Sequence, residues 1–163
     1  MVFEYCPKCG EKLDKKEIGD EGLVPFCVSC GNAWFNFSYP CVLCLIVDEN
    51  DKIVLTRERA DGFYGGVAGF IKEGESAEDA AKREVLEEVG LIADELKFMG
   101  SYSRGLDTLM INFICKTKNA ELKISEKELY AAGWHTIDEA INLVREGSII
   151  RKLINNYTQT KNL

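Results

Sequence analysis

From Pro40 onward, apolar and polar positions follow the periods of both strands and helices. The apolar run at residues 40–47 predicts a buried strand, and residues 53–57 predict its partner across a turn at 49–51. Further strands are predicted at 67–70, 96–104, 108–116 and 134–137, and helices at 77–89, 136–145 and 149–157. This order predicts an α/β fold with a sheet between helices.

The helix expected at 77–89 has clear signals at both ends. Ser76 and Asp79 have the spacing of a capping box, and Gly90 is suited to a left-handed C-cap. Within this helix, Glu84, Glu87 and Glu88 lie at i, i+3 and i+4, so their carboxylates share one face.

Three carboxylates on one face repel one another unless a cation lies among them. Hard oxygen ligands of this kind suit Mg²⁺ or Mn²⁺. A solvated acidic helix face is the simpler alternative, and the three glutamates alone would favour it.

The residues that flank the three glutamates favour the metal site over a solvated acidic face. The segment from Gly69 to Leu91 resembles the Nudix box, G-x5-E-x7-R-E-U-x-E-E-x-G-U with U aliphatic, and every specified position is filled, including Glu75 and Arg83. The resemblance implies an α/β/α Nudix sandwich with a mixed sheet, and a Mg²⁺- or Mn²⁺-dependent pyrophosphohydrolase. It also implies that Glu84 and Glu88 ligate the metal, and that Glu87 is a further ligand or the general base. Glu75 and Arg83 would then form an orienting ion pair.

The N-terminal cysteines predict a separate zinc ribbon. Cys6-x-x-Cys9-Gly and Cys27-x-x-Cys30-Gly are two knuckles whose four thiolates would close a tetrahedral structural zinc site. Free or redox-active cysteines are the alternative. We therefore expect a ribbon at residues 1–37, with a structural or dimer-forming role, and a Nudix hydrolase domain at 38–163.

The other cysteines do not fit a metal site. Cys41 and Cys44 lie three apart on the predicted strand, so their sulfur atoms should point to opposite faces. Cys115 is also expected to be a core residue.

Among Nudix proteins, the chain resembles the zinc-ribbon NADH pyrophosphatases. This likeness rests on four parts of the chain: the ribbon, the triplet Ala68-Gly69-Phe70, and the segments 127–134 and 147–154. By this match, Glu128 would complete the metal site from a loop. Phe70, the backbone of Ala68 and Ile150, and Phe35 would line the nucleotide pocket. The family's S-Q-P-W-P-F-P loop is replaced at residues 101–107 by Ser-Tyr-Ser-Arg-Gly-Leu-Asp, so the NADH preference does not carry over.

Net charge, apolar runs and histidine content argue against several other classes of function and location. The formal charge of −7 argues against a general affinity for nucleic acid, although the removal of NAD caps from RNA stays open. No apolar run reaches transmembrane length and no signal peptide is evident, so we expect a cytoplasmic location. The single histidine, His135, gives little support to Ser–His or Cys–His nucleophile mechanisms.

The leading interpretation is hydrolysis of the pyrophosphate in NAD(H), ADP-ribose or a related dinucleotide, releasing a nucleoside monophosphate. A nucleoside triphosphate pyrophosphohydrolase is the alternative, because Arg104 could contact a phosphate where the tryptophan is missing. A non-catalytic nucleotide-binding regulator is the third interpretation. A homodimer is compatible with each of them.

Overall fold

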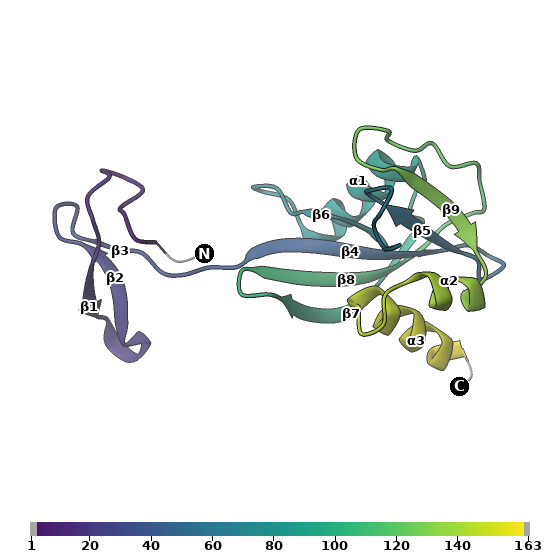
Figure 1. Cartoon of the computed structure of the whole chain (residues 1–163). Coiled ribbons are helices and arrows are strands. Elements are labelled where there is room, and N and C mark those ends of the chain that lie inside the picture. Colours follow the sequence, from purple (N-terminus) through teal and green to yellow (C-terminus); the bar gives the residue numbers. More distant parts are fainter. Residues whose placement is uncertain (1–2, 162–163) are drawn as a thin grey trace. The chain divides into compact units, whose positions relative to one another are not determined.

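The computed structural model describes residues 3–161, which form two compact units. One unit runs to Tyr39 and includes the turn Gly105–Asp107, and the other contains Pro40–Arg104 and the chain from Thr108 onward (Figure 1). No helix among the described residues has the length and apolar character needed to span a bilayer.

The N-terminal unit is built on a small antiparallel sheet. Its strands are β1 (Asp14–Glu17), β2 (Leu23–Cys27) and β3 (Asn32–Ala33), paired in that order, and a 3₁₀ turn (Gly19–Glu21) connects β1 to β2. The chain makes one cysteine-containing turn before β1 and a second between β2 and β3. In each turn a glycine N–H bonds back to a cysteine carbonyl, Gly10 to Cys6 at 2.8 Å and Gly31 to Cys27 at 2.9 Å.

The second unit is a six-stranded mixed sheet between helices, as the sequence predicts. Its strand order is β7-β8-β4-β5-β9, with β6 paired to β4. The strands are β4 (Tyr39–Val47), β5 (Ile53–Arg57), β6 (Val67–Phe70), β7 (Glu95–Arg104), β8 (Thr108–Lys116) and β9 (Ala131–His135). The helices are α1 (Ala77–Val89), α2 (Ile137–Leu143) and α3 (Ile149–Lys161), and α1 lies on the sheet face opposite to α2 and α3 (Figure 1).

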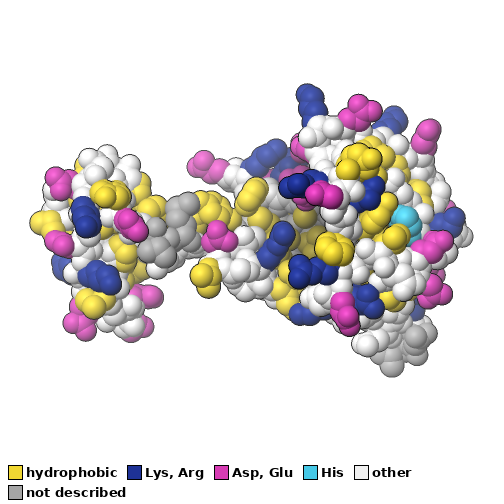
Figure 2. All heavy atoms as spheres, viewed as in Figure 1, with side chains coloured by type: hydrophobic (Ala, Val, Ile, Leu, Met, Phe, Trp, Pro, Cys, Tyr) yellow, Lys and Arg dark blue, Asp and Glu magenta, His cyan; other side chains and the backbone are white. Residues whose placement is uncertain are grey.

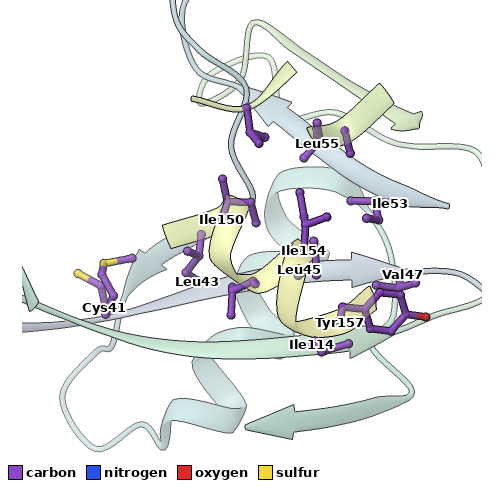
Figure 3. Close-up of a cluster of buried hydrophobic side chains, with 14 residues drawn as sticks. Cys41, Leu43, Leu45, Val47, Ile53, Leu55, Ile114, Ile150, Ile154 and Tyr157 are labelled. Atoms are coloured by element: carbon purple, nitrogen blue, oxygen red, sulfur yellow. The ribbon is translucent and has the colours of Figure 1, made fainter. Parts of the chain in front are cut away.

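The strand β4 is buried on both faces, and its residues alternate between two cores. Cys41, Leu43, Leu45 and Val47 pack with α3, whereas Val42, Cys44 and Ile46 pack with α1. Figure 3 shows Ile150, Ile154 and Tyr157 of α3 beside Leu43, Leu45 and Val47 in the first of these cores. The predicted divergence of Cys41 and Cys44 is confirmed, and Cys115 is buried in the second core.

Local capping explains where the helices begin. Thr136 and Glu139 form a complete capping box, so α2 starts at Ile137. The prediction of a strand at 134–137 is wrong at both ends. The strand β9 ends at His135, before the cap, and it begins at Ala131, which pairs with Arg57 of β5. At α1, Ser76 Oγ accepts from Asp79 N–H at 3.1 Å, but its hydroxyl donates to the Asp79 carboxylate at 2.7 Å. The expected reciprocal box is thus half formed.

Candidate metal and nucleotide site

Helix α1 and strand β6 together form the wall of an acidic cavity of about 430 Å³. The lining carboxylates come from three parts of the second unit: Glu84, Glu87 and Glu88 on α1, Glu128 on the loop before β9, and Glu58 directly after β5. Lys72 and Arg83 supply the cations of this cavity. The structure therefore gathers the helical glutamates with Glu128 in one cavity and adds Glu58.

The close approach of α1 to β6 depends on the absence of a side chain at Gly69. A Cβ atom built there would lie 1.9 Å from Oε1 of Glu84. Gly69 pairs with Val42 in the sheet, so the backbone is held in place and the carboxylate occupies the space of the missing side chain. The motif needs glycine at this position because a side chain there would collide with Glu84, a predicted metal ligand.

Arg83 connects the carboxylates of the site. Its Nε and Nη2 donate to the two oxygens of Glu75 at 2.7 and 2.9 Å, which forms the expected ion pair. Its Nη1 donates to Glu84 at 2.6 Å and to Glu87 at 3.0 Å. The Arg83 side chain lowers the pKa of Glu75 to about 2, with help from the N–H of Lys72. Glu75 therefore stays ionised and holds the arginine in place.

Glu88 is the most buried carboxyl group of the acidic cavity. Its side chain is 6% exposed, and one oxygen accepts from the N–H of Ala68 at 3.4 Å. Burial, together with the charges of Glu84, Glu128 and Glu58, raises the pKa of Glu88 to about 8 despite that hydrogen bond. A divalent cation would offset both the burial and the repulsion from the neighbouring carboxylates, and carboxylate oxygens are the ligands that Mg²⁺ and Mn²⁺ prefer.

Hydrogen bonds to the end of α1 hold the loop that carries Glu128. The N–H of Lys123 donates to the carbonyl of Val89 and that of Ser125 to the carbonyl of Glu88, both at 2.9 Å. The N–H of Glu128 then donates to Ser125 at 3.0 Å. The loop is therefore fixed to the same helix that carries the other acidic groups.

The raised pKa of Glu88 predicts how the affinity for a divalent metal should depend on pH. Below about pH 8, Glu88 carries a proton that a divalent cation must displace. The affinity for Mn²⁺ should therefore rise as the pH increases from 6 to 8, by up to about tenfold per unit, and level off above 8. Calorimetric titration at pH 6, 7, 8 and 9 measures this. An affinity that does not change between pH 6 and 8 would contradict it.

A second cavity of about 730 Å³ lies next to the acidic one and shares Glu58 and Ala68 with it. Ile150 and Arg104 line this larger cavity, whereas Phe70 lines the acidic one. Sequence reasoning missed its aromatic members Phe63 and Tyr64, and its cations Arg59, Arg145 and Lys152. Phe35 lies in the N-terminal unit with its side chain half exposed, and its role in nucleotide binding stays a prediction.

Glu58 is the carboxylate of the acidic cavity that the sequence did not reveal. The only signal is its position directly after an apolar strand, and no spacing connects it to the helix. Its neighbour Arg57 lies between the rings of Tyr64 and Tyr130, with Cζ 5.1 and 4.9 Å from the ring centroids. This stacking orients the chain where β5 ends and Glu58 begins.

The four N-terminal cysteines form a compact cluster in the other unit. The sulfur atoms of Cys6, Cys9, Cys27 and Cys30 all lie within 4.8 Å of one another. The Cys9 and Cys27 sulfurs are 3.6 Å apart, close to the roughly 3.8 Å edge of a tetrahedron with Zn–S bonds of about 2.3 Å. The neighbouring sulfur of Cys9 and burial raise the pKa of Cys30 to about 12, so four thiolates would need a cation between them. The cluster fits Zn²⁺.

Comparisons with known proteins agree with this geometry. Residues 38–157 match the NUDIX domain family. The NAD-capped RNA hydrolase NudC of Haemophilus influenzae (strain PittGG) is 31% identical over 160 residues, covering 94% of this chain and 59% of that relative's length.

Solved structures share the fold. The NUDIX hydrolase from Nitrosomonas europaea superposes with a TM-score of 0.81 at 22% identity, covering 98% of this chain and 93% of its own. The NUDIX domain of Shewanella oneidensis NrtR, solved with ADP-ribose, gives a TM-score of 0.66 at 16% identity, covering 77% of this chain and 90% of its own.

Proposed function

The chain belongs to the NUDIX domain family, and from this premise we propose that it hydrolyses the pyrophosphate bond of nucleoside diphosphates linked to another group. The observation that carries the proposal is the acidic cavity, where Glu58, Glu84, Glu87, Glu88 and Glu128 lie next to a nucleotide-sized cavity. NAD(H), ADP-ribose and related dinucleotides are the substrate class, and a nucleoside monophosphate is released.

In this proposal, Glu84, Glu88, Glu58 and Glu128 would hold Mg²⁺ or Mn²⁺, with Glu87 as a further ligand or the general base. Bound divalent metal would neutralise the pyrophosphate and lower the pKa of the attacking water. The residues of the chain set the geometry: Arg83 fixes Glu84 and Glu87, and Glu75 fixes Arg83. Glu88 is buried at the cavity wall, so little solvent reaches its carboxylate.

The proposed substrate class is inferred from two similar proteins. The H. influenzae protein is named for NAD-capped RNA, and the S. oneidensis domain binds ADP-ribose; both ligands contain an adenosine diphosphate unit. The chain spans about three fifths of the length of the first relative.

A substrate panel tests the proposal. NAD⁺, NADH, ADP-ribose, diadenosine polyphosphates and nucleoside triphosphates are incubated with Mg²⁺ or Mn²⁺, and the products are identified by mass. We expect AMP from the dinucleotides and ADP-ribose. Activity confined to nucleoside triphosphates would favour the alternative, which rests on Arg104 at the wall of the larger cavity. Binding without turnover of any member would favour a regulator.

We also propose that residues 1–37 form a zinc ribbon domain separate from the hydrolase domain at 38–163. The knuckles and their four clustered sulfurs support it. If the ribbon is the dimer-forming part, removing zinc should shift the oligomeric state measured by light scattering, and the hydrolase domain should keep its fold.

One zinc per chain is expected, independent of the catalytic metal. Cys27→Ser should reduce zinc content to well below one per chain and lower the unfolding temperature of the ribbon, because metal binding and folding are coupled. Elemental analysis and thermal unfolding measure both. Cys41→Ser is the matched control, because Cys41 belongs to the core of the second unit. Equal zinc loss in both variants would contradict the assignment.

A further inference from the structure

The larger cavity concentrates positive charge in a protein whose formal charge is −7. Arg59, Arg104, Arg145 and Lys152 line it, against Glu58 and Glu146. Arg59 is paired with Asp61 at 3.2 Å. The other three cations form no ion pair with a carboxylate within residues 3–161. Figure 2 shows several lysine and arginine side chains on the viewed face of the second unit, among acidic and hydrophobic ones.

Three separate elements hold these cations at the cavity wall. Arg104 ends β7, Arg145 lies in the turn after α2, and Lys152 lies in the first turns of α3. Ser148 fixes the turn, since its hydroxyl donates to the carbonyl of Arg145 at 2.6 Å and its oxygen accepts from the N–H of Arg151 at 3.3 Å. The backbone of these elements therefore fixes where the three cations lie at the cavity wall.

Aromatic rings position two of these cations. The guanidinium carbon of Arg145 lies 5.9 Å from the ring centroid of Phe63, and the ammonium of Lys152 lies 5.3 Å from that of Tyr102. A cation held against a ring face keeps its N–H groups available as donors. These contacts restrict the side chains while leaving the donors able to bind an anion.

The charge cannot be assigned to the scissile pyrophosphate. That group belongs beside the carboxylates of the acidic cavity, where divalent metal would neutralise it. The two cavities share Glu58 and Ala68, so a substrate bound there can extend into the larger one. An uncharged ring would need the aromatic wall but no cations. The cations therefore match a second anionic group in the part of the substrate that enters the larger cavity.

We propose that the larger cavity is a subsite for a phosphomonoester, and that the preferred substrates are nucleoside diphosphate-linked compounds that carry an additional phosphate. This inference rests on the proposed function and deepens it. The volume of about 730 Å³ suits one nucleoside-sized group. An RNA chain is disfavoured by the net charge of −7, because repeated backbone contacts need many cations.

Matched pairs that differ by one phosphate test the subsite. NADPH is compared with NADH, and 2′-phospho-ADP-ribose with ADP-ribose. We expect kcat/KM for the phosphorylated member to be at least about tenfold higher, because two or three charge-assisted hydrogen bonds are gained. The double variant Arg145→Gln/Lys152→Gln should bring the ratio close to one. Lys82→Gln/Lys97→Gln removes the same charge from exposed positions outside the cavity and should leave the ratio unchanged.

Three outcomes would overturn the subsite. The first is a ratio near one in the wild type, and the second is a high ratio that the double variant does not reduce. The third is a preference for an NAD-capped oligonucleotide over NADPH, which would assign the cations to an RNA backbone. If no pyrophosphate is cleaved in any pair, the proposed function fails, but calorimetric binding of the same pairs in Ca²⁺ still decides the subsite. Tighter binding of the phosphorylated members supports it, and equal binding overturns it.

Discussion

Glu88→Gln is expected to reduce kcat by about a hundredfold or more with either Mg²⁺ or Mn²⁺. The variant removes one negative charge from the metal site and hence stabilisation of the developing phosphate charge. It keeps the volume of the side chain and an oxygen to accept from Ala68 N–H. Steady-state kinetics measure the loss, and Glu78→Gln, an exposed change on the same helix, is the control.

The same variant should not destabilise the metal-free protein. The pKa of Glu88 is raised to about 8, so the folded state holds a proton that the unfolded state has already lost. Stability without metal is therefore lost as the pH rises toward 8, and the neutral glutamine avoids that loss. In EDTA at pH 9, Glu88→Gln should unfold at a temperature equal to or above that of the wild type. Near-normal turnover would show that the metal site is assigned wrongly.

Gly69→Ala is expected to remove most of the activity while the protein stays folded. The new Cβ would lie 1.9 Å from Oε1 of Glu84, so that carboxylate must move by more than an ångström. The atom it meets is the end of a flexible side chain, so the backbone can stay in place. A displacement of this size in a metal-ligating carboxylate should lower kcat by about a hundredfold.

Gly133→Ala is the matched control for this strand glycine. Its Cβ would meet Nε2 of His135 at 3.4 Å, which is ordinary van der Waals contact. Kinetics and thermal unfolding of both variants separate a local displacement from a folding defect. Full activity in Gly69→Ala would show that Glu84 is not needed where the structure places it.

Local sequence patterns determined the elements with strong signals. Helix α1 runs from Ala77 to Val89 as predicted, because Ser76 caps its start and Gly90 its end. The alternation of Cys41 and Cys44 between two cores follows from the two-residue period of a strand. The spacing of the two Cys-x-x-Cys units likewise brings their four sulfur atoms together.

Competition between a strand pattern and a helix cap explains one of the boundary errors. Trp134 and His135 read as strand, but the capping box of Thr136 and Glu139 satisfies backbone donors that a continued strand would have used. This explains why β9 ends at His135, whereas its start at Ala131 follows from pairing with Arg57 of β5.

The sequence by itself determined the acidic face of α1, the Glu75–Arg83 pair and the cysteine knuckles, because each depends on residues in one segment or at a fixed spacing. Only the tertiary structure placed Glu58 beside Glu88, and only it brought Arg104, Arg145 and Lys152 to one cavity. Those residues lie on elements far apart in the chain, and their meeting depends on strand order and helix packing. The likeness of a motif can identify the reaction, but the packing of distant elements sets the charge that a substrate meets.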